Sequence, residues 1–537
     1  MKTTHGNRGP TPWWHGAVGY QVYVRSFADA NGDGVGDLAG ISSRLPYLAH
    51  LGVDLVWITP FYPSPGFDHG YDVADYCDVD PSHGTLADFD HLVAEAHRLG
   101  LRVMVDIVPN HTSLHHPWFR AALADPTGPY RGYYHWRDPA PDGGPPNNWV
   151  AHFGGSAWTL DRASGQYYLH LFLPEQPDLN WTNPAVLDEF DAILRFWCDR
   201  GVDGFRIDVA HALSKDPWLR DNPVLYPVTA GMEPARAFAA FEHRYDLDQN
   251  PTVGIFRRWR TVVDPYEAAL LGETGPPDPV RLARYHDRGA ALHHTFFLRP
   301  AWMSWDPMLL RDGLRGVHLA SPDSVAWVIE NHDTNRAATR FGGGDRGRRR
   351  ALALTTLLMG LGGMPFVYQG QELGNENGEV ALEALTDPVS TRNPGATSGR
   401  DGARTAMAWD DGPGNGFTEA AAAWLVSTPR PLADTVAGQV DDPGSWLNTH
   451  RRLISFRSQH GDLVDAPVRW LDTDSGLLVA LQRGSVLVAC NLDEHPADLT
   501  LPEGGWALGF SSRPDTPVTV TATIAVPAET SLILVGG

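Results

Sequence analysis

The sequence is poor in positive charge and contains almost no lysine. Only two of its 42 basic residues are lysines, Lys2 and Lys215, and the acidic residues outnumber the basic ones to give a formal charge of −22. Nucleic acids and anionic membranes are polyanions that proteins bind through basic patches. The charge therefore argues against both as partners and favours a neutral or cationic small molecule as substrate.

Cysteines and long hydrophobic runs are scarce as well. The three cysteines, Cys77, Cys198 and Cys490, are odd in number and far apart, which argues against a disulfide framework or a cysteine metal cluster. No run of eighteen apolar residues occurs, and residues 1–16 lack the apolar core of a signal peptide. These features predict a cytoplasmic protein, and the oligomeric state is left open.

Helix-like and strand-like segments alternate along most of the chain. A periodic segment over 38–51 precedes an apolar run over 53–60, and the pattern recurs at 86–99 and 101–108. Such runs suit parallel strands that are buried on both faces. Further helices are predicted at 184–200, 252–263 and 348–359, and further strands at 18–27, 202–208, 269–273, 324–330 and 364–369. Seven or eight strand–helix units predict an α/β fold, the (β/α)8 TIM barrel.

Two segments depart from the barrel pattern. Residues 110–180 are rich in Pro, Gly, Trp and His and are too long for an ordinary loop, so we expect a subdomain inserted after the third strand. Residues 459–537 contain short strand patterns without helices and predict a C-terminal antiparallel β-sandwich. The catalytic barrel would then consist of residues 1–109 and 181–458.

Carboxylates stand where the predicted strands end. Asp106, Asp208 and Glu273 each end a strand, and Asp333 follows another. The C-terminal ends of barrel strands carry the active site in this fold, so such carboxylates favour chemistry. Arg206 lies two residues before Asp208 and shares its face of the strand. It would keep that carboxylate ionised for nucleophilic attack; a purely structural salt bridge is the alternative.

Spaced motifs give these carboxylates a family context. The chain contains, in order, GYDVADY at 70–76, DIVPNH at 106–111, QPDLN at 176–180, GFRIDVAH at 204–211, LGET at 271–274, ENHD at 330–333 and GRDGART at 399–405. In these motifs it resembles the α-amylase superfamily, glycoside hydrolase family 13, and within it the α-glucosidase and oligo-1,6-glucosidase branch. The resemblance spans residues 20 to about 410, and the C-terminal domain fits it too.

The resemblance implies a retaining double displacement. Asp208 would attack the anomeric carbon to form a β-glucosyl-enzyme, and Glu273 would protonate the leaving oxygen and then deprotonate water. Asp333 would grip the sugar hydroxyls and favour ring distortion. The two reacting carboxyl groups of such a pair lie roughly 5 to 5.5 Å apart.

Three further residues are assigned to the reacting sugar by the same resemblance. Arg206 would hold Asp208 ionised, while His111 and His332 would donate hydrogen bonds to sugar hydroxyls. A zinc site built from His and Asp is the competing interpretation. It is disfavoured because no His pair near the carboxylates has the spacing of metal ligands.

The resemblance also implies a closed pocket. Tyr71 would stack on the terminal glucose, and Asp68 and Arg404 would pair across the blind end, which makes the enzyme exo-acting. Phe153 and Phe172, in the inserted subdomain, are candidates for pocket walls, with ordinary core packing as the alternative.

Oxygen-bearing residues recur at every second position in one glycine-rich loop. This spacing can wrap a hard cation such as Ca²⁺, although Gly40 stands where an EF-hand has its bidentate Glu. The candidate ligands, which also match the family's Ca²⁺ loop, are Asp29, Asn31, Asp33, the Val35 carbonyl and Asp37. A polar turn without metal is the alternative. A structural Ca²⁺ is expected, and no organic cofactor.

Three functions compete for these residues. The first is an exo-α-glucosidase that hydrolyses short neutral α-glucosides of the maltose or isomaltose type. The second is a transglucosidase or trehalose-synthase-like isomerase, in which a sugar hydroxyl replaces water. The third, a non-catalytic binding protein, is disfavoured by the intact carboxylates. Val209 after the nucleophile occurs in members that prefer α-1,6 bonds, but Ala210 and His211 differ from those enzymes, so the linkage is left open.

Overall fold

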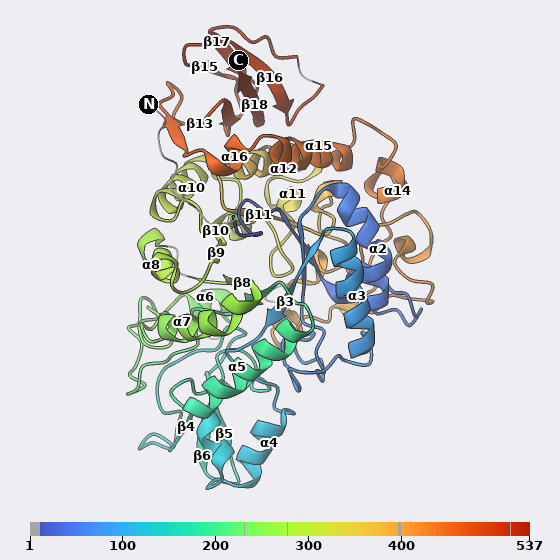
Figure 1. The fold of residues 1–537 in the computed structure, drawn as a ribbon. Coiled ribbons are helices and arrows are strands. Elements are labelled where there is room, and N and C mark those ends of the chain that lie inside the picture. The colour runs from blue at the N-terminus through green and yellow to red at the C-terminus, as the bar shows by residue number, and fades with distance from the viewer. Residues whose placement is uncertain (1–10, 230, 276–277, 396–398, 516) are drawn as a thin grey trace.

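Eight parallel strands close into a barrel at the centre of the protein (Figure 1). The structure is a computed structural model, and it describes residues 11–229, 231–275, 278–395, 399–515 and 517–537. Neighbouring strands follow the order β1-β11-β10-β9-β8-β7-β3-β2 around the barrel. The strands are β1 Gly19–Val22, β2 Leu55–Ile58, β3 Arg102–Ile107, β7 Gly204–Ile207, β8 Ala269–Gly272, β9 His294–Phe297, β10 Val325–Trp327 and β11 Met364–Tyr368. The predicted (β/α)8 barrel is confirmed.

Helices cover the outside of the barrel. The longer ones are α2 Leu38–Leu51, α3 Leu86–Arg98, α5 Pro184–Asp199, α7 Thr252–Val263, α10 Pro307–Ala320 and α12 Gly344–Gly360. Each has an apolar face toward the strands, and the strands are buried on both sides, as parallel strands in such a fold must be. Apolar side chains therefore pack on both faces of the barrel strands, in two clusters.

Two barrel elements differ from the sequence prediction. The predicted strand over 18–27 ends at Val22, and Val24–Phe27 forms the short helix α1. Val24 and Phe27 are three residues apart, so one helical turn buries both. The strand β9 was not predicted, because its four residues follow only the short helix α8 Pro279–Arg284 and lack the long helical pattern that marks the other units.

Smaller antiparallel sheets flank the barrel at opposite ends of the molecule (Figure 1). Between β3 and α5 lies an antiparallel sheet of order β4-β6-β5, formed by Trp136–Arg137, Gln166–Leu169 and Trp158–Asp161, together with α4 Pro117–Ala124. At the other end, a five-stranded sheet of order β12-β13-β14-β18-β16 packs against the pair β15-β17. Their bounds are β12 Arg469–Leu471, β13 Leu478–Arg483, β14 Val486–Asn491, β15 Ala497–Thr500, β16 Trp506–Ser511, β17 Thr523–Val526 and β18 Thr530–Gly536.

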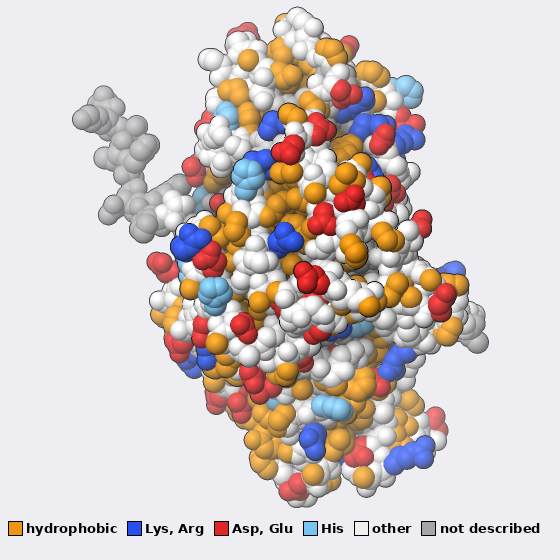
Figure 2. All heavy atoms as spheres, turned by 90° about the vertical axis from the view of Figure 1, so that its right-hand side faces the viewer, with side chains coloured by type: hydrophobic (Ala, Val, Ile, Leu, Met, Phe, Trp, Pro, Cys, Tyr) orange, Lys and Arg blue, Asp and Glu red, His pale blue; other side chains and the backbone are white. Residues whose placement is uncertain are grey.

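Charges of both signs are mixed on the surface face shown in Figure 2. Acidic and basic side chains alternate there with hydrophobic ones and form no extended basic patch on that face. In the described residues, no helix combines the length and the apolar character that crossing a membrane would require.

Candidate active site

A cavity of about 820 Å³ lies at the C-terminal ends of the barrel strands. Its size is typical of small-molecule sites, which span roughly 300 to 1,000 Å³. Eight of the residues predicted from sequence line it: Asp68, Tyr71, His111, Phe153, Phe172, Asp208, Glu273 and Asp333. Three others, Arg206, His332 and Arg404, lie behind this lining and are almost fully buried. The barrel thus gathers residues that are 265 positions apart in the chain, from Asp68 to Asp333, around one space.

Arg206 is bonded to three carboxylates at once. The register of β7 against its neighbours places it beside Asp106 on β3, and its Nη1 donates to Asp106 Oδ1 at 2.8 Å and to Asp208 Oδ1 at 2.6 Å. Its Nη2 lies 2.8 Å from Glu273 Oε2. The same guanidinium therefore holds both proposed reacting carboxylates, which fits a closely spaced pair.

Burial and crowding change how these carboxylates titrate. Burial raises the pKa of Asp208 well above its usual range, the neighbouring charges of Glu273 and Asp106 raise it further, and the Arg206 guanidinium opposes the shift. Burial also raises the pKa of Asp106 to about 6, again against Arg206. The positive charge of Arg206 therefore offsets much of the penalty for burying these negative charges.

Asp333 has the opposite electrostatic surroundings. Its Oδ1 accepts from Arg404 at 2.8 Å and from Arg400 at 3.1 Å. Burial alone would raise the pKa of Asp333, but the positive charges of Arg400 and Arg404 hold it well below its usual range. Asp333 is therefore a carboxylate throughout the physiological pH range, and it can accept hydrogen bonds from hydroxyl groups.

The ion pair at the blind end differs from the predicted one. Asp68 pairs with Arg400, whose Nη2 lies 2.8 Å from Asp68 Oδ1, so the predicted pair of Asp68 with Arg404 is wrong. Arg404 instead donates to Asp333 and, through Nε, to the His332 carbonyl at 2.8 Å. The two arginines flank the single 3-10 turn Asp401–Ala403, so both reach the same charged cluster.

Rings and imidazoles form the rest of the predicted site. Tyr71 stacks on His332, with 5.3 Å between ring centroids, and donates to Asp106 Oδ2 at 3.0 Å. Burial lowers the pKa of both His111 and His332, so both are neutral and can exchange hydrogen bonds without carrying charge. His332 Nε2 lies 3.1 Å from Asp333 Oδ2 but makes no well-directed hydrogen bond there.

The imidazole of His111 is already engaged by the protein. Its Nε2 lies 3.1 Å from the Tyr71 carbonyl and 3.0 Å from the Gln176 amide. Phe153 meets Phe172 edge-on, with 5.8 Å between ring centroids, and both line the cavity. The two phenylalanines therefore lie at the pocket wall, and Phe172 also packs against a neighbouring apolar cluster that includes Leu171 and Val209.

Sequence reasoning missed one wall of the cavity. Rings from the inserted subdomain and from the segment between β7 and α7 stack face to face there. The ring centroid of His152 lies 4.5 Å from that of Phe172 and 3.9 Å from that of Phe238. The centroids of Phe238 and His243 are 3.6 Å apart. The available signal was the length of the loop, about forty residues after Asp208, which is typical of functional loops. The other lining residues that were missed include His211, Asp248, Arg281, Trp302 and Arg400.

The loop predicted to bind calcium is held together by its own hydrogen bonds. Asp29 accepts from the amides of Gly32 and Gly34 at 2.8 Å, and Asp37 accepts from the Gly40 amide at the start of α2. Within the described ranges, no three His, Cys, Asp or Glu side chains converge as a metal ligand set. The calcium site stays a prediction.

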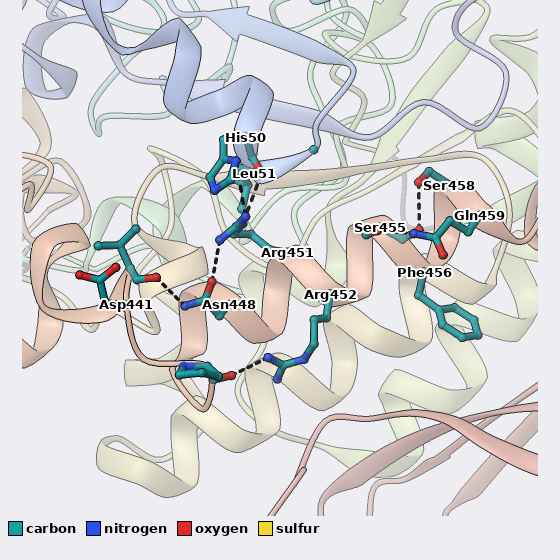
Figure 3. Close-up of a pocket in the computed structure, with 13 residues that line it drawn as sticks. His50, Leu51, Asp441, Asn448, Arg451, Arg452, Ser455, Phe456, Ser458 and Gln459 are labelled. Carbon is teal, nitrogen blue, oxygen red and sulfur yellow. Dashed lines mark hydrogen bonds between the residues drawn. The ribbon is translucent and has the colours of Figure 1, made fainter.

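A second cavity, of about 610 Å³, lies between the end of α2 and helix α15 Trp446–Gln459 (Figure 3). Arg451 lies across it, bonded to the His50 carbonyl and to Asn448 Oδ1 at 3.3 and 2.7 Å. None of the strand-end carboxylates lines this second cavity. We therefore assign the active site to the cavity at the strand ends.

Comparison with known proteins gives consistent matches over nearly the whole chain. The family model for the alpha amylase catalytic domain matches residues 21–466. A probable alpha-glucosidase of Rhizobium meliloti (strain 1021) is 42% identical over 504 residues, 91% of each chain. An oligo-1,6-glucosidase of Heyndrickxia coagulans is 36% identical and aligns over 97% of this chain and 99% of its own. The solved structure of an alpha-glucosyl transfer enzyme, XgtA, has a TM-score of 0.91 at 38% identity and aligns over 98% of this chain and 100% of that one.

Proposed function

This chain belongs to the alpha-amylase catalytic-domain family, glycoside hydrolase family 13, and on that premise we propose that it is a retaining, exo-acting α-glucosidase of short neutral α-glucosides. One observation carries the proposal. A single buried arginine, Arg206, bridges Asp208 and Glu273 at the floor of a cavity that the paired side chains of Asp68 and Arg400 also line. In this proposal the ion pair closes one end of the cavity, so that the site admits one terminal sugar and blocks passage of a chain.

In the first step Asp208 attacks the anomeric carbon while Glu273 gives its proton to the leaving oxygen. This breaks the glycosidic bond and leaves glucose attached to Asp208 as a β-glucosyl ester. In the second step Glu273 takes a proton from water, and the resulting oxygen displaces Asp208, so the α configuration is retained. Asp333 binds the sugar hydroxyls, and its pairing with Arg404 keeps it ionised throughout.

The test is the early time course of products from maltose and isomaltose, with the glucose anomers resolved. Each cleavage also releases the reducing-end glucose, which leaves as the anomeric mixture already present in the substrate. We therefore expect the early glucose to contain α-anomer in excess of the mutarotation equilibrium, which establishes retention, and the disaccharide that is cleaved faster identifies the preferred linkage. An early excess of β-glucose would contradict the proposal, because it would show direct attack by water.

The second candidate function is transfer of glucose to an acceptor hydroxyl. Two observations favour it: the cavity extends beyond the carboxylates along a wall of stacked rings, including His152 and Phe238, and the chain is similar to a protein described as an alpha-glucosyl transfer enzyme. Longer or rearranged sugars that appear before free glucose would favour this function over hydrolysis.

We also propose that the protein acts in the cytoplasm. All three cysteines, Cys77, Cys198 and Cys490, are free thiols, and the last two are buried, which suits a reducing compartment. Fractionation of the producing cells tests the location, and activity in the secreted fraction would contradict it.

A further inference from the structure

The turn after Asp208 lies directly against the segment that carries Glu273. The amide of Val209 donates to Glu273 Oε2 at 3.1 Å, and the amide of Ala210 donates to the Glu273 carbonyl at 2.8 Å. The side chain and the main chain of Glu273 are therefore both held by consecutive amides of one turn. The position of this carboxylate depends on the conformation of that turn.

The turn has an unfavourable backbone conformation. Val209 has φ +44°, and it is the only β-branched residue among the nine described non-glycine residues with positive φ. Left-handed backbone is disfavoured for residues with a Cβ, most strongly for β-branched ones. Contacts elsewhere must hold Val209 in this conformation, and it is this conformation that directs its amide toward Glu273.

The next residues supply such a contact. The Nε2 edge of the His211 imidazole lies against Gly275: a Cβ added to Gly275 would stand 2.8 Å from His211 Nε2 and 3.1 Å from Cε1. The His211 carbonyl accepts from the Asp248 amide at 2.7 Å, which fixes the far end of the turn. In the described part of the chain, His211 Nδ1 is buried and makes no well-directed hydrogen bond. Burial lowers the pKa of this imidazole, while the charge and the backbone of Glu273 oppose that shift, which places the ring close to Glu273 as well as to Gly275.

We propose that His211 is a positioning residue for Glu273: seated on Gly275, its ring fixes the turn whose Val209 amide holds the Glu273 carboxylate. The inference rests on the proposed function, in which Glu273 is the acid and base. It also gives one physical reason for two local features of the sequence, His211 after the nucleophile and Gly275 after Glu273. A side chain at position 275 would occupy the place of the imidazole.

The hydrogen bond from the Val209 amide to Glu273 matters at one point of the reaction. When Glu273 has given its proton to the leaving oxygen it is a carboxylate, and a hydrogen bond from the Val209 amide stabilises that charge. A leaving sugar needs this proton, whereas 4-nitrophenolate is a good leaving group without it. Loss of the positioning should therefore slow cleavage of maltose more than cleavage of 4-nitrophenyl α-glucoside.

A double-mutant cycle tests the contact. Gly275→Ala adds a methyl group where the ring lies, at a position without left-handed backbone, and His211→Ala removes the ring. We expect each variant to lose about ten-fold or more in kcat/KM for maltose, with a smaller loss for the aryl glucoside. The alkaline limb of the pH profile should move in both variants. The double variant should be no worse than His211→Ala alone, because without the ring the methyl group meets nothing.

Gly254→Ala is the matched control, since a Cβ added at this position on α7 would have no neighbour within 4 Å. It should leave kcat/KM and the pH profile unchanged. Additive losses in the cycle, or an unmoved alkaline limb, would overturn the inference. A rise in KM for maltose alone, with the pH profile unchanged, would instead show that His211 touches the leaving sugar directly, and would overturn it too.

The Glu273→Gln variant separates this inference from the proposed function. If Glu273→Gln retains wild-type kcat/KM for maltose, the acid and base is misassigned and the proposed function fails with it. If Glu273→Gln is inactive but the cycle is additive, only the positioning role of His211 fails.

Discussion

Arg400 Nη2 lies 2.8 Å from Asp68 Oδ1, and both side chains line the cavity at the strand ends. The same guanidinium lies 2.9 Å from Asp387 and 3.1 Å from Asp333, so one arginine bonds three acidic side chains. These contacts connect the blind end of the pocket to the carboxylate proposed to grip the sugar. The geometry makes Arg400, rather than Arg404, the residue that shapes the pocket end.

Removing Arg400 should therefore damage activity severely. In Arg400→Ala, the buried carboxylates of Asp68 and Asp387 lose their partner, a change that typically costs about 3–5 kcal/mol. We expect kcat/KM for maltose to fall by about a hundred-fold or more. The control is Arg392→Ala, because Arg392 pairs with Glu175 at the surface and exposed pairs contribute little. A variant Arg400→Ala with near wild-type kinetics would refute this account of the pocket end.

The nucleophile assignment predicts a larger loss. In Asp208→Asn the side chain keeps its size but cannot form the glucosyl ester, so kcat should fall by about four orders of magnitude. Asp498→Asn, at an exposed carboxylate on β15, is the matched control and should be unchanged. Stopped-flow kinetics with 4-nitrophenyl α-glucoside measures both. Glucose release by Asp208→Asn at the wild-type rate would exclude Asp208 as the nucleophile.

The raised pKa of Asp208 predicts where activity is lost on acidification. Asp208 must be ionised to attack, and burial raises its pKa against the opposing charge of Arg206. As pH falls through a raised pKa, the carboxylate is protonated and activity disappears, so the acid limb of kcat/KM should lie well above about 3.9, the value of an ordinary Asp.

Arg206→Lys weakens the opposing interaction and should move this acid limb to still higher pH, because lysine cannot bridge carboxylates in the planar, two-pronged way of arginine. Circular dichroism at each pH controls for unfolding. A wild-type acid limb near pH 4 would contradict the predicted electrostatics of the site.

The loop between Asp29 and Asp37 predicts a response to calcium. If the loop binds Ca²⁺, mass action stabilises the fold by about 2.7 kcal/mol at a hundred-fold excess over Kd, and EDTA should lower Tm by a few degrees. The variant Asp33→Ala should lose this response. An identical Tm with Ca²⁺ and with EDTA would show that the loop's own hydrogen bonds, such as those to Asp29, suffice.

The proposed exo action predicts selectivity for chain length. If the Asp68–Arg400 pair blocks threading of a polysaccharide through the cavity of about 820 Å³, maltose and maltotriose should be hydrolysed at least about a hundred-fold faster than starch in kcat/KM per chain end. Reducing-end assays compare them directly. Rapid loss of starch viscosity would show attack within chains, which this pocket end does not allow.

The sequence by itself determined the barrel and the placement of the carboxylates that are proposed to react. Long periodic segments such as 38–51 and 252–263 became α2 and α7 with the predicted bounds, because helix periodicity and caps are local properties of the chain. The positions of Asp208 and Glu273 at strand ends could also be predicted from local sequence, because this fold brings the C-terminal ends of all its strands to one rim. The motifs supplied the rest of the predicted pocket.

Only the tertiary structure decided which partner each charged group meets. Arg400 and Arg404 are four residues apart in one motif, and nothing local indicates which of them reaches Asp68, more than 300 residues away. The short strand β9, the stacked rings of the β7–α7 loop and the seat of His211 on Gly275 likewise depend on segments that approach through packing. Distances between side chains are set by how the whole barrel closes, whereas the order of its elements is written in the sequence pattern.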